Sequence, residues 1–392
     1  MEKVVSAHNE EFSSPPDIVL SAPGRFHLVG EHSWYFKDKT LSMAVNLPVY
    51  LAISKRPDSS LRFYFPQTKE RKRANITSLK YRREDRWANN VKALMFAFVS
   101  MGHELPGMNV TVYSDILPSA GFGITTAIKV ATALALRTLF SLPYDDKAIM
   151  DILEKANRVF LSTEHYVSDL NAALFAKKNT CILTNHKTKT YKTIPFPFKD
   201  HTIVLTDARV PRISLWDEET IRREEYRNVL KDLEIRKNGD WGYEDSEAEI
   251  ADVLSDVPED VRRRLICVMK EHQYVVDAVD GLETKDFSKF ARAVNKSHEI
   301  MRDLYQISCP EIDWLVKRVL EFDSMAIRKA DSCARITGKG FGRCTYTIIK
   351  NEDVETYMQK LSDYERIFGF HPVTYIVKPV DGAAIQYPYK KS

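Results

Sequence analysis

The interpretation of this chain depends most on the stretch Ser114-Asp-Ile-Leu-Pro-Ser-Ala-Gly-Phe-Gly-Ile-Thr-Thr-Ala-Ile-Lys-Val-Ala-Thr-Ala-Leu-Ala-Leu-Arg137. Residues 109–113, just before it, alternate as a strand does, and the Ala-rich segment after Thr126 has apolar residues at helical spacing. We therefore predict a strand, a loop of small residues and a helix. Glycines let the backbone approach a ligand closely, and a helix start presents N–H groups, so this loop is a candidate anion site.

The candidate phosphate-binding residues of this loop are Gly121, Gly123, Thr125 and Thr126. The two threonine hydroxyls can reach a phosphate or a Mg²⁺ ion. The alternative is an ordinary helix N-terminus capped by threonine, because such residues are common at helix starts. This stretch alone leaves both interpretations open.

A second candidate cluster follows a strand expected over residues 18–22, in the turn Pro23-Gly-Arg-Phe-His-Leu-Val-Gly-Glu-His32. Arg25 can bind a phosphate through two hydrogen bonds, whereas Glu31 and His32 can bind the hydroxyls of a polar substrate. The alternative is a surface ion pair between Arg25 and Glu31, which would stabilise the protein little.

Asp169 lies near the start of a helix expected over residues 166–175. It is either a charge that favours the helix dipole or a base beside a substrate hydroxyl. A basic, hydrophilic connection is expected over residues 69–86, and a charged, solvated helix over residues 215–236. Further helices are predicted over residues 87–100, 145–163, 261–279, 286–304, 312–322 and 354–368.

Length and composition limit the class of protein. A chain of 392 residues usually forms more than one domain, and we expect residues 1–16 to be a flexible tail. The 57 basic and 54 acidic residues nearly balance, so a nucleic-acid partner is not favoured. The five cysteines lack metal-ligand spacing, and no apolar run approaches the roughly 18 residues of a membrane span. We expect a cytoplasmic protein without a membrane partner.

Five separated stretches of the chain resemble the galactokinases, which belong to the superfamily of homoserine, mevalonate and phosphomevalonate kinases. The stretches are Ala22-Pro-Gly-Arg-Phe-His-Leu-Val-Gly-Glu-His32, Trp87-Ala-Asn-Asn-Val-Lys92, residues 297–313, Thr337-Gly-Lys-Gly-Phe-Gly-Arg-Cys344 and Tyr375-Ile-Val-Lys-Pro-Val-Asp-Gly382. They occur in the family's order and span residues 18–383.

The resemblance implies a two-lobed α+β small-molecule kinase fold with mixed sheets and helices and an active site in the cleft between the lobes. The N-terminal lobe is expected over residues 17–196, and the C-terminal lobe, with a glycine loop at 337–344, over residues 197–392. The implied reaction is transfer of the ATP γ-phosphoryl group to the anomeric hydroxyl of galactose or a related hexose. ATP and Mg²⁺ are the implied cofactors, and a monomer is expected.

Roles for individual residues also follow from the resemblance. Asp169 is placed as the catalytic carboxylate, with Arg25 opposite it at the moving phosphoryl group. Gly121, Gly123 and Thr125 would hold the triphosphate, with Thr125 also a metal ligand, and Glu31 and His32 would hold sugar hydroxyls. The remaining expected nucleotide contacts are Thr126, Trp87, Gly338 and Gly340.

The sequence departs from the family's pattern at several of these positions. Trp34 occupies the position where an aspartate usually binds the sugar, and Glu219 occupies the position of a tyrosine that contacts the sugar. Ile124 replaces a hydroxyl of the phosphate loop, and Asn157 aligns with an acidic residue that helps to hold Mg²⁺. A catalytically weak or inactive sugar or nucleotide sensor on the same fold is therefore the alternative. Retention of both Arg25 and Asp169 favours the enzyme.

Overall fold

The computed structural model describes residues 1–32, 38–115, 122–163, 167–211, 228, 231, 254–255, 257–323, 329–338 and 343–387. By internal contacts, the chain forms two compact units. The first comprises Met1–Arg25, Ala44–Lys178 and Val380–Ser392, and the second Phe26–Met43 and Asn179–Pro379. This division differs from lobes drawn by chain order, because the C-terminal strand pairs with the first strand of the chain.

The first sheet has eight strands. Six follow the order β12-β1-β2-β5-β3-β4, while β6 pairs with β2 and β7 with β6. Strand β3 is parallel to β5, with Phe63 opposite Val110. The pairings β1–β12, β2–β5, β2–β6, β3–β4 and β6–β7 are antiparallel. The strands are β1 (Ile18–Val29), β2 (Lys39–Lys55), β3 (Ser60–Phe65), β4 (Glu70–Asn75), β5 (Met108–Ser114), β6 (Thr180–Asn185), β7 (Thr190–Pro195) and β12 (Ala384–Tyr387).

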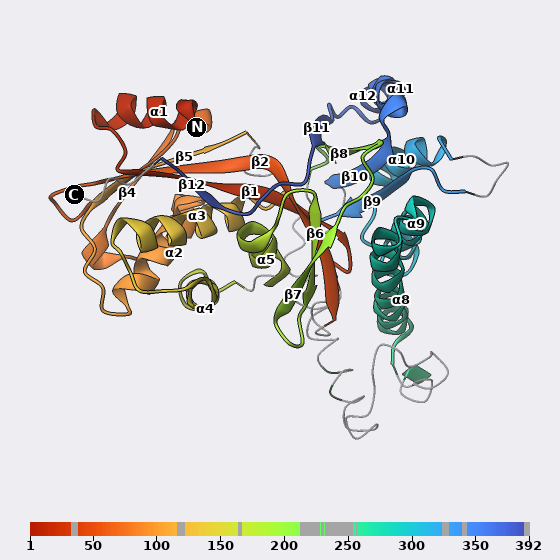
Figure 1. Ribbon diagram of the computed structural model, residues 1–392, viewed down its shortest axis with the longest axis horizontal. Helices are drawn as coiled ribbons and strands as arrows, with labels where there is room; N and C mark the ends of the chain where they lie inside the picture. The colour runs from red at the N-terminus through yellow and green to blue at the C-terminus, as the bar shows by residue number, and fades with distance from the viewer. Residues whose placement is uncertain are drawn as a thin grey trace. The chain divides into compact units, whose positions relative to one another are not determined.

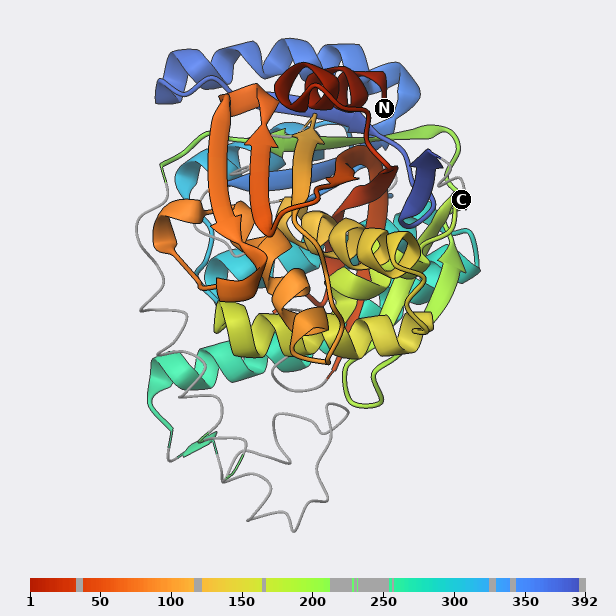
Figure 2. The ribbon, with the colours of Figure 1, turned by 90° about the vertical axis from the view of Figure 1, so that its left-hand side faces the viewer.

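Within the first unit, helix α1 lies on one side of the strands, and helices α2 and α3 lie on the other (Figures 1 and 2). The helices of this unit are α1 (Glu2–Phe12), α2 (Ala88–Val99), α3 (Ile124–Leu139), α4 (Asp146–Ala156) and α5 (Val167–Phe175), with a π-helical turn at Asn157–Leu161. Helices α2 and α3 bury residues all round rather than along one stripe, as expected of helices inside a core. The predicted strand and helix on either side of the small-residue loop are confirmed.

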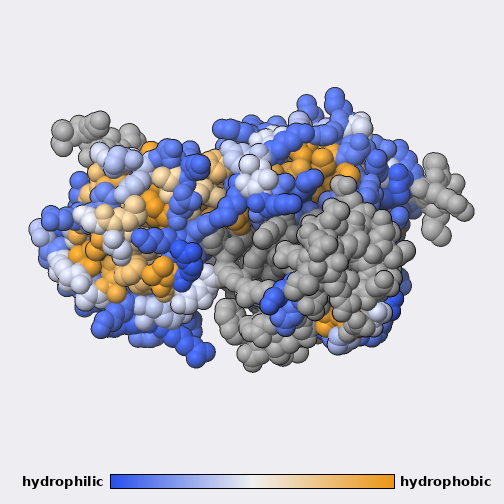
Figure 3. Space-filling view, turned by 90° about the horizontal axis from the view of Figure 1, so that it is seen from below, coloured by the Kyte–Doolittle hydropathy of each residue, from blue (hydrophilic) through white to orange (hydrophobic). Residues whose placement is uncertain are grey.

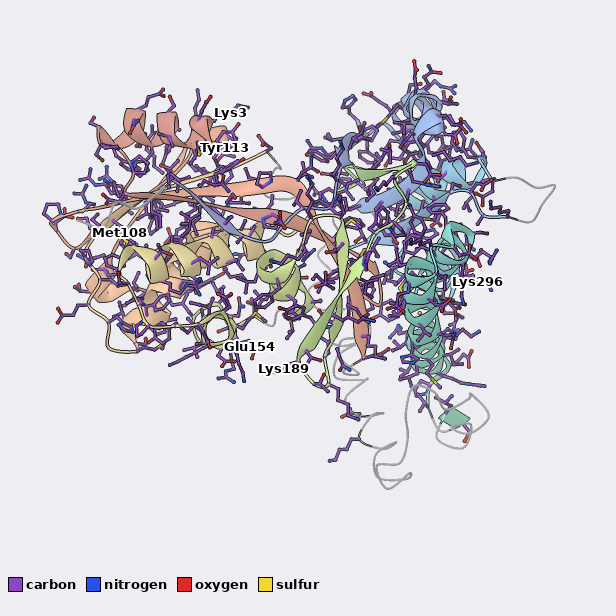
Figure 4. All side chains as sticks on the ribbon, in the orientation of Figure 1. Lys3, Met108, Tyr113, Glu154, Lys189 and Lys296 are labelled. Carbon is purple, nitrogen blue, oxygen red and sulfur yellow. The ribbon has the colours of Figure 1, made fainter. Side chains whose placement is uncertain are left out.

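Residues 2–12, within the segment expected to be a flexible tail, form a helix. Val4 and His8, one helical turn apart, are buried. The His8 ring lies 2.9 Å from Thr111 Oγ1 and 3.0 Å from Ser54 Oγ, and burial lowers the pKa of His8 to about 4. The Lys3 ammonium lies 5.7 Å from the centre of the Tyr113 ring (Figure 4). These contacts dock the segment on the sheet.

Two further strand expectations need correction. The connection expected over residues 69–86 contains strand β4, which pairs with β3. Its side chains alternate between exposed and half-buried, so an edge strand of this kind has no apolar pattern to reveal it. Strand β1 also continues to Val29, through the segment where a turn was expected, and is buried over nearly its whole length.

The second unit also contains a four-stranded antiparallel sheet in the order β11-β8-β10-β9. Its strands are β8 (His201–Asp207), β9 (Cys333–Thr337), β10 (Cys344–Lys350) and β11 (Val373–Val377). Helices α8 (Glu259–Glu283) and α9 (Phe287–Asp303) pack side by side (Figure 1), followed by α10 (Pro310–Leu320), α11 (Val354–Lys360) and α12 (Ser362–Phe368). The helices predicted in this part of the sequence are confirmed, although the last is split into two.

The core of the second unit joins its sheet to its helices. Val204 and Ile336 on the strands pack in one buried cluster with Leu265, Met301 and Leu315 on the helices.

On the face shown in Figure 3, apolar residues are interspersed with hydrophilic ones. Apart from residues 228 and 231, the helix expected over residues 215–236 lies outside the described residues. Among those described, no helix has the length and apolar character needed to cross a membrane.

Candidate active site

A buried ion pair in the first unit joins the two residues that were expected to carry the chemistry. Arg25 comes from β1 and Asp169 from the first turn of α5. The distance from Arg25 Nη2 to Asp169 Oδ2 is 2.5 Å, and the two residues are 9% and 4% exposed. Burying a charged pair costs desolvation energy, so such a pair is weak evidence for a stabilising role. Pairs of this kind occur at functional sites as well as in structural networks.

The start of α3 packs directly against Arg25. Gly123, with φ +83°, immediately precedes the helix, and the Arg25 N–H donates to the carbonyl of Phe122 at 2.9 Å. A Cβ atom on Gly123 would lie 2.9 Å from Arg25 Cγ and 3.4 Å from Arg25 Nε. Only glycine therefore fits this position without moving the guanidinium that pairs with Asp169.

The two threonines of this turn differ. Thr126 is buried, and its hydroxyl donates to Asp169 Oδ2 at 3.5 Å, a long hydrogen bond. Thr125 is exposed. The sequence did not distinguish them, because the direction of each side chain depends on how α3 packs. Thr126 thus belongs with Asp169, and Thr125 remains the candidate for contact with a phosphate or metal ion.

Replacing Gly123 with alanine is expected to lower kcat at least about tenfold, because displacing a positioned group by about 1 Å can cost up to about 100-fold. The matched control is Gly102→Ala. Gly102 has a similar φ of +89°, but an added Cβ atom would meet nothing within 4 Å. Alanine at position 102 therefore introduces backbone strain without a steric contact. Steady-state kinetics and thermal unfolding of both variants check this. Equal losses of activity would show that backbone strain, not contact with Arg25, is responsible.

A lysine that the sequence analysis did not select lies in the same cluster. Lys129 Nζ donates to Asn157 Oδ1 at 2.6 Å, and both residues are buried. Burial lowers the pKa of Lys129 to about 8; Asp169 acts to raise it, and Arg25 to lower it further. Its position three residues after Thr126, within the largely apolar middle of α3, is the sequence signal that was available.

In the second unit, Glu31 is part of a separate buried network. Its Oε1 lies 2.8 Å from His27 Nδ1, and its Oε2 accepts a hydrogen bond from the Gly338 N–H at 2.8 Å. Burial acts to raise the pKa of Glu31, but the hydrogen bond and electrostatic interaction with His27, together with the electrostatic effects of His32 and Arg335, outweigh it, so the net shift of the pKa is downward. Glu31 is only 3% exposed, and each of its carboxylate oxygens has a protein partner.

Arg335 holds this network together. Its Nη2 lies 3.1 Å from Glu271 Oε1, and its Nη1 lies 3.8 Å from Glu31 Oε2. Its Nε donates to Ser297 Oγ at 2.7 Å, and the Ser297 hydroxyl donates to Glu271 Oε2 at 2.6 Å. Sequence reasoning missed Arg335 and Glu271, which lie 64 positions apart and meet only through tertiary packing.

The other predicted site residues are placed as follows. His32 is buried, with its ring centre 5.0 Å from that of Tyr305. Trp87 packs against Phe65 and donates its indole N–H to Glu70 Oε2 at 2.9 Å, so its described contacts belong to the protein core. Gly338 has φ +85°. The residues Trp34, Gly121, Glu219 and Gly340 lie outside the described part of the chain.

The described residues do not form a carboxylate cage for a divalent ion. Among them, no group of three or more His, Cys, Asp or Glu side chains could hold a metal. At Asn157, the side-chain oxygen accepts a hydrogen bond from the Lys129 ammonium, a donor that repels a second cation.

Comparison with known proteins identifies the family. The family model of the galactokinase galactose-binding signature matches residues 6–55, and that of the GHMP kinases N terminal domain matches residues 89–177. A Treponema pallidum protein provisionally named as a galactokinase is 41% identical over 391 residues, covering 98% of this chain and 96% of the relative. The chain belongs to the galactokinase family. The galactokinase of Clostridium acetobutylicum is 29% identical, with 93% of this chain and 94% of that protein covered.

Solved structures of galactokinase-family and related kinases share the fold. Lactococcus lactis galactokinase complexed with galactose matches with a TM-score of 0.87 at 20% identity, covering 98% of this chain and 99% of that one. Methanococcus jannaschii mevalonate kinase matches with a TM-score of 0.65 at 14% identity, covering 93% and 98%. The predicted two-lobed α+β kinase fold is confirmed, as is the prediction of a galactokinase-like sugar kinase that uses ATP. Arg25 lies in the first matched region and Asp169 in the second.

Proposed function

We propose that this galactokinase-family protein transfers the γ-phosphoryl group of ATP to the anomeric hydroxyl of galactose or a related hexose, giving the sugar 1-phosphate and ADP. The observation that carries the proposal is the buried contact between Arg25 and Asp169 beside the start of α3. Asp169 accepts the proton of the attacking hydroxyl while the new O–P bond forms and the bond to ADP breaks. Arg25 stabilises the negative charge on the moving phosphoryl group.

The first unit supplies further contacts to the nucleotide in this proposal. Gly123 and the N–H groups at the start of α3 bind phosphate oxygens, with Gly121 in the same loop. Thr125 is the candidate ligand for a Mg²⁺ ion that arrives with ATP, and this ion would neutralise charge on the phosphates. Trp87, Gly338 and Gly340 remain proposed nucleotide contacts.

The sugar contacts are proposed from the second unit. Because the Glu31 carboxylate already forms hydrogen bonds with His27 and Gly338, we propose that Glu31 fixes the geometry of the sugar site. His32, next to it, is the better candidate for a direct contact with a sugar hydroxyl. Trp34 and Glu219 stay proposed substrate contacts. A monomeric state and a cytoplasmic location also stay predictions.

The test is to incubate the protein with ATP, Mg²⁺ and a panel of hexoses, and to follow ADP release. We expect ADP formation that depends on the sugar and is highest with galactose, with the 1-phosphate identified by ³¹P NMR. Methyl galactoside is the matched control, because it lacks only the anomeric hydroxyl and should give no turnover. Equal turnover with methyl galactoside would rule out the anomeric acceptor. ATP binding without turnover of any hexose would favour the sensor.

A further inference from the structure

A buried cation that the proposed reaction does not use lies beside Asp169. Lys129 is only 5% exposed and follows Thr126 by three residues on α3, so the two side chains lie on the same face of the helix. Thr126 contacts Asp169, and the ammonium of Lys129 contacts Asn157. The ammonium is thus held inside the protein, next to the group that is proposed to accept the proton.

The charges around Lys129 are not balanced within the described residues. Helix α5 contributes Asp169, but Asp169 already pairs with Arg25 at 2.5 Å. On α2, the buried Lys92 has its own partner, Asp85, at 2.6 Å, and the buried residues of α4 are apolar. The described hydrogen-bond partner of Lys129 is an amide and not a carboxylate.

A buried ammonium with an amide partner suits a bound anion. Removing an ammonium from water costs several kcal/mol, and a neutral amide recovers little of that cost. An anion near the start of α3 would recover much more, because Coulomb attraction is strong where water is excluded.

We propose that Lys129 supplies part of the positive charge that holds the phosphate chain of ATP, so that nucleotide binding depends little on a divalent ion held by the protein. This inference rests on the proposed function, because it assumes that ATP binds beside α3. Lys129 acts through its charge, from inside the protein, and we place it as a positioning residue rather than a catalytic one.

Proton linkage gives a direct test. A bound phosphate chain would raise the pKa of Lys129 from about 8, so ATP binding at pH 8 should take up about half a proton. At pH 6 the lysine is protonated in both states, and uptake from this group should vanish. ATP affinity should therefore fall as the pH rises through 8. Calorimetry in buffers of different ionisation enthalpy, with ATP and EDTA, measures both the proton uptake and the affinity for ATP.

Lys129→Gln is the test variant, because glutamine keeps an N–H donor for Asn157 but has no charge. If ATP raises the pKa of Lys129 by one to two units, this variant should bind ATP roughly 10- to 100-fold more weakly at pH 7 and take up no proton from this group at pH 8. Lys147→Gln is the matched control, since Lys147 is an exposed lysine on α4. Thermal unfolding checks that each variant is folded, and Lys129→Met serves if the glutamine variant is not.

The outcomes separate this inference from the proposed function. Hexose turnover with no proton uptake at pH 8, and equal ATP affinity in both variants, would overturn the role of Lys129 alone. Proton-linked ATP binding that only Lys129→Gln loses would support it even if no hexose were phosphorylated. A loss of more than about 100-fold in ATP affinity on adding EDTA to the unaltered protein would show that a divalent ion carries the binding after all.

Discussion

Asp169→Asn is expected to lower kcat by about 1,000-fold, with the KM for the sugar changed far less, because general-base catalysis contributes about 10²–10⁴-fold. Asparagine matches aspartate in size and can still accept a hydrogen bond from Arg25. It cannot take up the proton of the attacking hydroxyl. The charge opposite Arg25 is lost as well, so the guanidinium is left buried without its carboxylate.

The control for this prediction is Asp151→Asn, which removes the same charge from an exposed position on α4. ADP release with ATP and galactose should be unchanged in the control. Circular dichroism and ATP binding should show that both variants are folded. If Asp169→Asn keeps more than about a tenth of the activity, Asp169 is not the base, since a base in the rate-limiting step contributes more than that.

Arg335→Met is expected to destabilise the protein by about 3–5 kcal/mol, because it leaves the carboxylates of Glu271 and Glu31 buried without their shared cation. The guanidinium also donates to Ser297 and to the Ile336 carbonyl, and methionine replaces neither hydrogen bond. Urea unfolding of the variant should show a lower midpoint.

Two companion variants sharpen that result. Arg62→Met removes an exposed guanidinium on β3 and should change stability by less than about 0.5 kcal/mol. Arg335→Lys keeps the charge but loses the planar guanidinium group. The stability of this variant should therefore lie between that of Arg335→Met and that of the unaltered protein. A loss below about 1 kcal/mol for Arg335→Met would mean that the network contributes no more than a surface ion pair does.

Some of the residues of the candidate active site were selected from the sequence. Arg25 and Asp169 were selected from the turn after the first strand and from a helix start, and the structure pairs them directly. Gly123 was selected because glycine permits close approach, and the close approach proves to be with Arg25. Residues such as these could be found because short local patterns, a glycine turn or a helix start, limit what the side chain can do.

Other parts of the molecule have no local pattern to reveal them. Strand β4 is basic and half-solvated, so its sequence reads as a loop although it pairs with β3 along its length. Lys129 looks like one polar residue on a helix until α3 is buried against its neighbours. The Glu31 carboxylate looked suited to a sugar hydroxyl, yet Gly338, 307 positions away, donates to it.

By itself, the sequence determined the fold class, the order of most helices and strands, and the identity of the acid and guanidinium proposed for phosphoryl transfer. The helices and strands follow from periodicity, whereas the fold class and the roles proposed for these two residues follow from the resemblance of short motifs to those of the galactokinases. Only the tertiary structure decided which buried charges meet. It paired Arg25 with Asp169, placed Lys129 against Asn157, and joined Glu31 to Gly338. The physical reason is that the energy of a buried charge depends on partners brought in from distant segments, and these partners come together only when the chain packs.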